Sequence, residues 1–455
     1  MLKLSFFHFS LCAALIGLFA RGGVARSAVK IRQKLLVFLL DGFRWDYDDL
    51  PGLRGFPRIK EKGASATYLR PVFPSSSYPN YQSLVTGLYV ESHGLLGNYV
   101  YDPKYAEYFR MGRYPAQYES LWWEGGEPVW ITAEKQGRSS YLYFWPGCEV
   151  SVGGLRPTFC LPYTTMPHLG DLDVAIKESL RLFQNESADF IGIYVELPDK
   201  FGHKFGPDTQ EVQELVYQLD ARFDYLHQEL EDRFMSDDVN IMLMSDHGMT
   251  SVSVPEHVLD IRHHVSYFDL ERTVGAGAVT GVWPAQNKTL QVLHALSIEE
   301  HWSAYLREEI PDRWHYKHHY RAPPILLVAD PGYYILTFSS RSVGVYSDTG
   351  LPEQGWHGYD NFDIDMQGIF AAYGPAFRPG AQTTVVEAVD MYQLMCKVLD
   401  VTPSPHHNGT WANVEPFLKN EVPYFTAQEE ANTASVKSIA PSVVIIVIVN
   451  NNYEP

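Results

Sequence analysis

Six side chains of the kinds that bind divalent metals stand at widely separated points of the chain. They are three aspartates and three histidines: Asp41, Asp199, His203, Asp246, His247 and His357. Imidazole and carboxylate together suit Zn²⁺, and six such groups can hold two neighbouring ions while leaving positions open for a substrate. Two ions about 3.5–4 Å apart stabilise both the attacking and the leaving oxygen of a phosphoryl displacement. Singly, each group also fits a turn, a helix-face pair or a cap, so the metal hypothesis depends on all six together.

The elements that would position these groups alternate between strand and helix. Three continuous apolar runs end at or near the aspartates: Leu35–Leu40, Phe190–Val195 and Val239–Met244. The second and third runs are each preceded by a stretch with helical periodicity, Asp171–Phe183 and Gln210–Phe234. Such runs are typical of strands buried on both faces of a parallel sheet. Open α/β sheets bind their ligands beyond the carboxyl ends of the strands. The sequence therefore predicts an α/β fold with its chemistry at that edge.

A metal pair of this kind needs a nucleophile. A Ser/Pro loop precedes a short predicted helix from Asn80 to Thr86, which ends at Gly87. A hydroxyl at a helix start is favoured as an oxyanion by the positive end of the dipole, and far more by a bound metal. The alternative is an N-cap serine. Composition does not choose among the three candidates, Ser75, Ser76 and Ser77.

Nine segments, spread in order along nearly the whole chain, match the motifs of a known family. They are Leu40–Arg44, Ser77–Asn80, Val85–Gly94, Gly97–Asn98, Gly126–Trp130, Tyr143–Gly147, Asp199–Pro207, Ser245–Met249 and Gly355–Gly358. Together they resemble the ectonucleotide pyrophosphatase/phosphodiesterase family of the alkaline phosphatase superfamily. The resemblance implies an alkaline-phosphatase-like α/β/α sandwich. Its central sheet would be mostly parallel, with the metal site at the carboxyl ends of the strands.

The resemblance also implies a role for each matched residue. Ser77 would be the nucleophile, which resolves the choice among the serines. One zinc would be held by Asp199, His203 and His357, and the other by Asp41, Asp246 and His247 together with the Ser77 oxygen. Asn98 and the backbone N–H of Ser77 would donate to a phosphate oxygen. Ser77 would then attack a phosphodiester in line, and water would cleave the resulting phosphoserine ester.

Composition excludes two other classes of protein. The 455 residues include 36 Lys+Arg against 54 Asp+Glu, a formal net charge of −18, which offers no general cationic surface for a nucleic-acid polymer. With 45% hydrophobic residues, the chain can bury a large core, so wholesale disorder is excluded. We expect one catalytic domain over residues 26–420, followed by a tail at 421–455.

The N-terminus and three sequons predict secretion. A short basic start, an apolar stretch and small residues near position 25 are typical of a signal peptide over residues 1–25. Asn185, Asn287 and Asn408 each begin a glycosylation triplet. We expect a secreted or cell-surface protein. A lipid anchor on the C-terminal tail stays open, because the apolar run there is short and ends in polar residues.

Cysteine usage fits the same compartment. Cys12 lies within the signal peptide, so Cys148, Cys160 and Cys396 remain, which suggests one local bridge between the first two and one free thiol. The family resemblance supports that bridge. The chain lacks Cys-rich modules, so it looks like the short members of the family.

Four further segments, together with serine as the nucleophile, resemble the choline-specific members of the family: Tyr78–Tyr81, Gly97–Tyr99, Leu121–Trp123 and Trp145–Val150. This resemblance implies a choline-containing glycerophosphodiester as the substrate, glycerophosphocholine or lysophosphatidylcholine, from which phosphocholine would be released. Choline has no N–H to donate, so it needs aromatic faces and a carboxylate. The predicted residues are Tyr143, Trp145, Tyr194 and Glu149, all of which could instead fill the core.

Two alternatives stay open. A nucleotide phosphodiesterase would stack a base on the same aromatic residues, and Lys200–Gly202 departs from the acidic stretch of the choline-specific members. A catalytically silent ectodomain ranks last, because every expected metal position is filled. The expected partners are a small-molecule or lysolipid phosphodiester and, through an anchor, a membrane surface; a homodimer stays open.

Overall fold

The computed structural model describes residues 32–419, apart from 113–117, 255 and 339–352. The predicted signal peptide and C-terminal tail lie outside these residues. Among the helices that the structure describes, none has both the length and the apolar character needed to span a bilayer.

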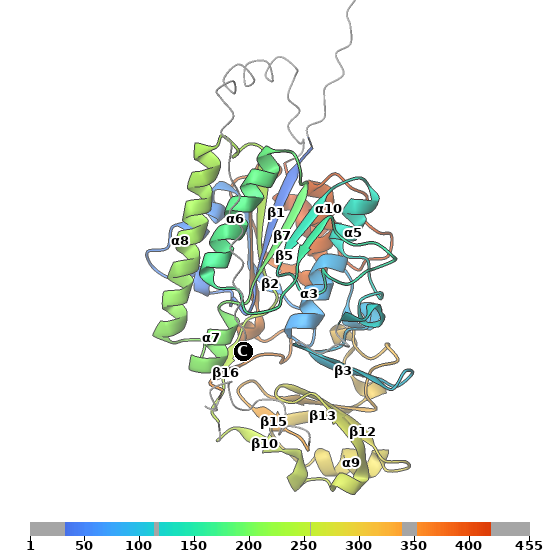
Figure 1. Ribbon diagram of the computed structural model, residues 1–455. Helices are drawn as coiled ribbons and strands as arrows, with labels where there is room; N and C mark the ends of the chain where they lie inside the picture. Colours follow the sequence, from blue (N-terminus) through green and yellow to red (C-terminus); the bar gives the residue numbers. More distant parts are fainter. Residues whose placement is uncertain (1–31, 113–117, 255, 339–352, 420–455) are drawn as a thin grey trace, which may run out of the picture. The chain divides into compact units, whose positions relative to one another are not determined.

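An eight-stranded sheet forms the centre of the structure (Figure 1). Its strands are β1 (Lys34–Leu40), β2 (Ala64–Arg70), β5 (Ser140–Tyr143), β6 (Phe159–Leu161), β7 (Phe190–Val195), β8 (Val239–Ser245), β17 (Gly368–Tyr373) and β18 (Ala381–Glu387). They lie in the order β18-β2-β17-β8-β1-β7-β5-β6. Every pairing is parallel except those of β17, which runs antiparallel to β2 and β8. The predicted α/β fold with a mostly parallel sheet is confirmed.

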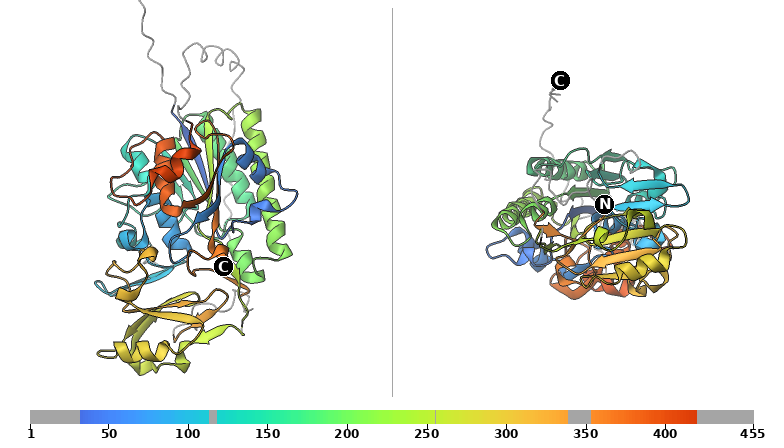
Figure 2. Two further views of the ribbon diagram at one scale, coloured as in Figure 1. Left: turned by 180° about the vertical axis from the view of Figure 1, so that it is seen from behind. Right: turned by 90° about the horizontal axis from the view of Figure 1, so that it is seen from below.

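Helices cover both faces of this sheet, because its central strands are apolar on both sides (Figures 1 and 2). Alternate residues of β1 enter two different apolar layers, with Leu35, Val37 and Leu39 in one and Leu36, Phe38 and Leu40 in the other. The first layer includes side chains of α3 (Ser77–Thr86), α4 (Val90–His93), α5 (Val129–Lys135), α10 (Met391–Val398) and α11 (Trp411–Val414). The second includes side chains of α2 (Gly55–Lys62), α6 (Leu169–Gln184) and α8 (Gln210–Asp232).

A second, antiparallel sheet was not predicted from the sequence. Its strands are β11 (Leu270–Val274), β12 (Val279–Pro284), β13 (Trp302–Leu306) and β14 (Ile325–Ala329), in the order β11-β12-β14-β13. Val292 and Leu296 of α9 (Thr289–Leu296) pack with Val282 of β12 in a separate apolar cluster. Three two-stranded pairs complete the fold: β3 (Tyr99–Asp102) with β4 (Glu107–Arg110), β9 (Thr250–Ser251) with β16 (Gly355–Trp356), and β10 (Val258–Asp260) with β15 (Tyr334–Leu336).

The helix after the Ser/Pro loop is longer than the sequence predicted. It begins at Ser77 rather than Asn80, because Pro79 falls in the first turn, where a missing N–H costs no hydrogen bond. It ends as predicted at Gly87, whose φ of 68° gives the left-handed cap that glycine adopts without strain. This earlier start places Ser77 at the N-terminus of a helix.

Candidate active site

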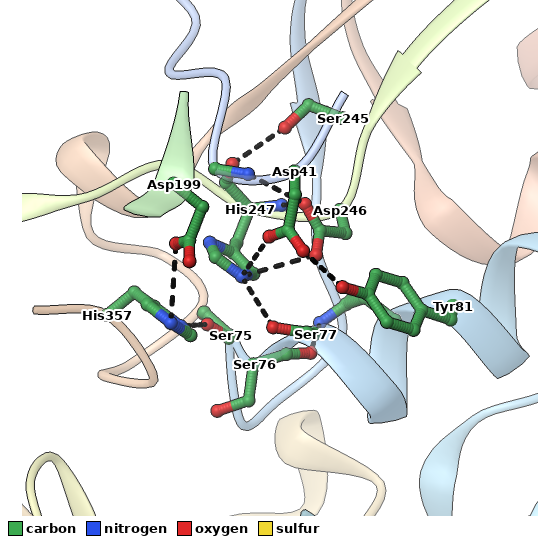
Figure 3. Close-up of polar contacts among 12 residues, drawn as sticks. Asp41, Ser75, Ser76, Ser77, Tyr81, Asp199, Ser245, Asp246, His247 and His357 are labelled. Carbon is green, nitrogen blue, oxygen red and sulfur yellow. Dashed lines mark hydrogen bonds and ion pairs between the residues drawn. The ribbon is translucent and has the colours of Figure 1, made fainter. Parts of the chain in front are cut away.

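The six predicted metal ligands converge at the carboxyl ends of the central strands. Figure 3 shows five of them, Asp41, Asp199, Asp246, His247 and His357. Asp41 directly follows β1, and Asp246 and His247 directly follow β8. The other three come from α7 (Asp199–Phe205), which follows β7, and from the residue after β16: Asp199, His203 and His357. Two groups have ligand atoms within 4.8 Å of one another, Asp41 with Asp246 and His247, and Asp199 with His247 and His357.

The distances describe one continuous cluster centred on His247. Its Nε2 lies 3.4 Å from Oδ1 of Asp41 and 3.2 Å from Oδ2 of Asp246. The ring of His247 stacks on that of His357 with 3.7 Å between centroids. Asp199 lies between the other two histidines, 3.7 Å from Nε2 of His357 and 3.5 Å from Nε2 of His203. All six ligands predicted for two metals are therefore neighbours.

The three imidazoles share one orientation. In each ring Nδ1 pairs with a backbone carbonyl: His203 with Gly355 at 2.9 Å, His247 with Gly248 at 2.8 Å, and His357 with Ser75 at 3.0 Å. A carbonyl only accepts, so Nδ1 carries the proton and Nε2 is left with its lone pair. This outer hydrogen bond is the usual arrangement for a histidine that binds a metal.

The three carboxylates each keep one oxygen without a hydrogen bond. Those oxygens are Oδ1 of Asp41, Oδ1 of Asp199 and Oδ2 of Asp246, all buried. The other oxygen of Asp246 accepts from the backbone N–H groups of Gly42 and His247, both at 3.0 Å. A buried carboxylate oxygen without a partner is costly. The donor set and these oxygens together fit divalent cations such as Zn²⁺.

Burial sets the protonation of the cluster. It raises the pKa of Asp41, with a further contribution from the charge of Asp246, and raises the pKa of Asp246 to about 8. Burial also lowers the pKa of His203 to about 4 and that of His247 to about 3. The imidazoles are thus neutral at pH 7, and the neutral imidazole is the form that binds metals. The crowded carboxylates repel one another, so a bound cation between them would be favoured.

Ser77 lies beside this cluster. Its Oγ is 3.3 Å from Nε2 of His247, and both groups are buried (Figure 3). Ser75 is instead held by a hydrogen bond to the carbonyl of Tyr359, at 3.0 Å. Ser76 is the N-cap residue of α3 and makes no side-chain capping bond.

Asn98 faces the same region from the start of β3. Its Oδ1 accepts the backbone N–H of Tyr78 at 2.9 Å, which fixes the amide and directs its Nδ2 donor group away from that bond. Asn98 and Ser77 both line a cavity of about 460 Å³.

The walls of this cavity come from the region around the metal ligands and from the second sheet. They include five aromatic residues, two acidic residues and two lysines: Tyr99, Tyr101, Trp283, Tyr316, Trp356, Glu196, Glu353, Lys200 and Lys204. Sequence reasoning missed most of these as site residues. Tyr99 and Lys200 stood in segments singled out for substrate preference, whereas Trp283 and Tyr316 carry no local signal.

The four residues predicted to bind choline do not line this cavity. Trp145 is 1% exposed and packs in the core against Trp130. Tyr143 is buried in the layer on the opposite face of the sheet. Tyr194 lies close to the metal cluster, but its hydroxyl bonds to Asp41. Glu149 is half-buried, and burial raises its pKa.

The features predicted for a secreted protein can be located in part. Cys148 and Cys160 form the predicted disulfide, with 5.8 Å between their Cα atoms, and Cys396 is a buried free thiol. Asn185, Asn287 and Asn408 are all exposed. A disulfide of this kind is typical of the secretory pathway.

Comparison with known proteins places this site in a family. The sequence profile described as Type I phosphodiesterase / nucleotide pyrophosphatase matches residues 35–360, which include all six clustered ligands, Ser77 and Asn98. The chain belongs to this family. It is a phosphodiester hydrolase, as the resemblance of its motifs implied.

Individual relatives agree over most of the chain. Ectonucleotide pyrophosphatase/phosphodiesterase family member 5 from Homo sapiens is 32% identical over 413 residues, which cover 90% of this chain and 83% of the relative. A bis(5'-adenosyl)-triphosphatase from Xenopus laevis is 35% identical over 390 residues, covering 85% and 82%. The solved structure of an inactive murine ectonucleotide pyrophosphatase/phosphodiesterase 5 in complex with AMP superposes with a TM-score of 0.77 at 34% identity, over 85% of this chain and 100% of that one.

Proposed function

We propose that this phosphodiesterase hydrolyses nucleotide phosphodiester or pyrophosphate bonds with two zinc ions. The observation that carries the proposal is the make-up of the cavity beside Ser77. Aromatic rings that could stack on a base line it together with Lys200 and Lys204. The relatives named for a bis(5'-adenosyl)-triphosphatase activity and for a complex with AMP support the same substrate class.

The two lysines favour an anionic substrate. They lie four residues apart on α7, which also carries Asp199 and His203, so they share one side of the helix beside the metal ligands. Both are exposed at the cavity. Cations there would attract the extra phosphates of a nucleotide and repel a quaternary ammonium group.

In the proposed reaction Ser77 gives up its hydroxyl proton and its Oγ attacks phosphorus in line. The bond to the leaving oxygen breaks, that oxygen takes up a proton, and water then hydrolyses the phosphoserine ester. Asn98 donates from Nδ2 to a phosphoryl oxygen as charge develops there. The six clustered ligands would hold the ions, which when bound supply Lewis-acid stabilisation of the attacking and leaving oxygens. The neutral imidazoles keep Nε2 directed at that position because their Nδ1 protons are held by backbone carbonyls.

The choline ester predicted from the sequence is the second candidate. Glu196 and Glu353 line the cavity together with the rings of Tyr99 and Tyr101. A carboxylate beside aromatic faces is what a quaternary ammonium group needs. This set differs entirely from the four residues that the sequence suggested.

One assay separates the two candidates. Purified protein is given p-nitrophenyl thymidine monophosphate or p-nitrophenyl phosphocholine, with and without a chelator, and the release of p-nitrophenol is measured. We expect the nucleotide ester to be preferred, and activity with either ester to be lost on chelation and restored by Zn²⁺. A preference for the choline ester would reverse the ranking, and full activity in chelator would refute the zinc proposal.

The nucleophile is tested in the same assay. Ser77→Ala should lower turnover of both esters by about 10⁴-fold or more, because no other group replaces the attacking oxygen. Ser75→Ala is the matched control, since that hydroxyl bonds to the Tyr359 carbonyl instead of facing the cluster. Retained turnover in Ser77→Ala would refute its assignment.

We also propose that the protein acts outside the cell. The disulfide and the three exposed sequons support this location. Attachment to the membrane through residues 421–455 stays a prediction, because the tail lies outside the described residues.

A further inference from the structure

Two buried tyrosines bind the same carboxylate oxygen of a metal ligand. The hydroxyl groups of Tyr81, on α3, and Tyr194, on β7, both donate to Oδ2 of Asp41. The two phenol oxygens are 2.9 Å apart, and the side chains are 3% and 4% exposed. Figure 3 shows Tyr81 reaching Asp41 from the side opposite Asp199 and His357. No step of the proposed reaction uses either phenol.

Because of these two bonds, the two carboxylate oxygens of Asp41 differ in their surroundings. Oδ2 is occupied by two donors, whereas Oδ1 has no hydrogen bond and lies 3.4 Å from Nε2 of His247. Turning the carboxylate away would break both phenol bonds, and because the two hydroxyl groups could then donate only to one another, at least one would lose its acceptor, which is costly. Asp41 is therefore held with Oδ1 directed at the cluster.

Asp41 differs in this respect from Asp246, which directly follows the neighbouring strand β8. One oxygen of Asp246 is held by the backbone N–H groups of Gly42 and His247, so main chain alone fixes it. Asp41 depends on side chains from two other elements. Of these two carboxylates, only that of Asp41 can therefore be reoriented by substitutions that leave the backbone and all six clustered residues intact.

We propose that Tyr81 and Tyr194 are positioning residues that set the affinity of the Asp41 site for its divalent cation. They act through the carboxylate and touch neither substrate nor metal. The proposal rests on the metal site of the proposed function. Partners of this kind, which bind a ligand rather than the metal, typically change metal affinity by about 10- to 100-fold when removed.

The test is Zn²⁺ binding to metal-stripped protein, measured by competition with a chelating indicator. Wild type should bind two ions. Tyr81→Phe and Tyr194→Phe should each weaken one of the two binding events by about 10-fold, and the double variant by up to about 100-fold, while the other event is unchanged. Phenylalanine keeps the ring and removes only the hydroxyl.

Tyr163→Phe is the matched control. Its ring contacts that of Tyr194, with 5.9 Å between centroids, but its hydroxyl donates to Glu196 at 2.8 Å rather than to Asp41. This variant should bind both ions as wild type does. A weakening as large as that in Tyr194→Phe would assign the effect to general packing and overturn the proposal.

A double-mutant cycle with Asp41→Ala separates positioning from fold stability. Once Asp41 is removed, the phenylalanine substitutions should cause no further loss of Zn²⁺ affinity. If the Phe variants bind both ions with wild-type affinity, the inference fails and the metal site stands. If wild type binds no Zn²⁺, the proposed function fails as well.

Circular dichroism of the metal-stripped protein shows whether each Phe variant folds. A variant that does not fold would point to a purely structural role in place of the one proposed.

Discussion

Five of the six clustered residues, all but Asp199, use one polar atom to hold their place and leave another for a metal. The three imidazoles are fixed through Nδ1 by backbone carbonyls, and Asp246 is fixed through Oδ1 by backbone N–H groups. Such fixing reduces the reorganisation that metal binding would otherwise require. Asn98 repeats the pattern, since its Oδ1 is held by Tyr78 and its Nδ2 remains as a donor.

The role of Asn98 can be tested with a matched pair of substitutions. Asn98→Asp keeps an oxygen that accepts the Tyr78 N–H but replaces the Nδ2 donor, whereas Asn98→Ala removes both. If the donor stabilises the transition state, kcat for the nucleotide ester should fall by about 10²- to 10³-fold in both variants.

Thermal unfolding and zinc content serve as controls for the two Asn98 variants. A drop in kcat confined to Asn98→Ala would show that the amide only supports the Tyr78 backbone. An unchanged kcat in both variants would remove Asn98 from the proposed reaction.

At the scale of elements, the turn after β1 sets the separation of two ligand-bearing segments. Gly42 has a φ of +64°, and a Cβ placed on it would lie 2.8 Å from Cβ of Asp199. The backbone N–H of Asp199 also donates to the carbonyl of Asp41, at 3.1 Å. The end of β1 and the start of α7 therefore approach as closely as their backbones permit.

Gly42→Ala should consequently displace Asp199 rather than simply destabilise the turn. Alanine at positive φ costs about 1 kcal/mol, and the contact with Asp199 must be relieved by movement of α7. We expect turnover of the nucleotide ester to fall by at least about 10-fold, with weaker Zn²⁺ binding. Gly52→Ala is the control, because Gly52 also has a positive φ, 88°, but its added Cβ would meet nothing within 4 Å. Equal effects of the two substitutions would contradict the steric argument.

The same scale shows what could be predicted from the sequence. β1, β7 and β8 were predicted because both faces are buried, which makes their sequences continuously apolar. β11 of the second sheet is half-exposed, and its sequence LERTV gives no such run. β14 of that sheet does have a buried apolar run, ILLVA, but such a run does not tell which sheet its strand joins. Trp283, on β12, reaches the cavity wall as part of this sheet, so the wall could not be predicted either.

The four residues predicted to bind choline lie outside the cavity lining for a related reason. Position near a strand end indicates that a residue is close to the site, but it does not tell which way the side chain points. Tyr143 and Trp145 are two residues apart, yet they lie in layers on opposite faces of the sheet. Phe144 between them has a φ of 60°, which breaks the alternation that a regular strand would impose. The clustering of the six predicted ligands could be anticipated because motifs, rather than side-chain direction, identified them.

At the scale of the whole molecule, buried histidines away from the metal cluster make stability depend on pH. His93 is 1% exposed. Its Nδ1 accepts the backbone N–H of Leu95 at 3.2 Å, and its Nε2 lies 3.0 Å from Oγ of Ser83. Burial lowers its pKa from 6.5 to about 3. His227 is also buried, and its pKa is lowered to about 4.

The sign of the effect follows from proton uptake. Between pH 6.5 and about 3 the unfolded chain binds a proton at His93 and the folded protein does not. The free energy of unfolding therefore falls as the pH drops below 6.5, by about 1.4 kcal/mol per pH unit for one such group. His93→Gln keeps a polar side chain without this titration, so its stability should fall less steeply than that of wild type between about pH 6.5 and pH 5.

Urea unfolding at several pH values measures how steeply the free energy of unfolding changes with pH in the two proteins. The residues of the metal cluster are the same in both, so they contribute equally to the two slopes. His263→Gln, at an exposed histidine, should keep the wild-type slope. If His93→Gln also keeps it, His93 is not a source of the acid sensitivity, and the buried neutral imidazole inferred from its contacts is wrong.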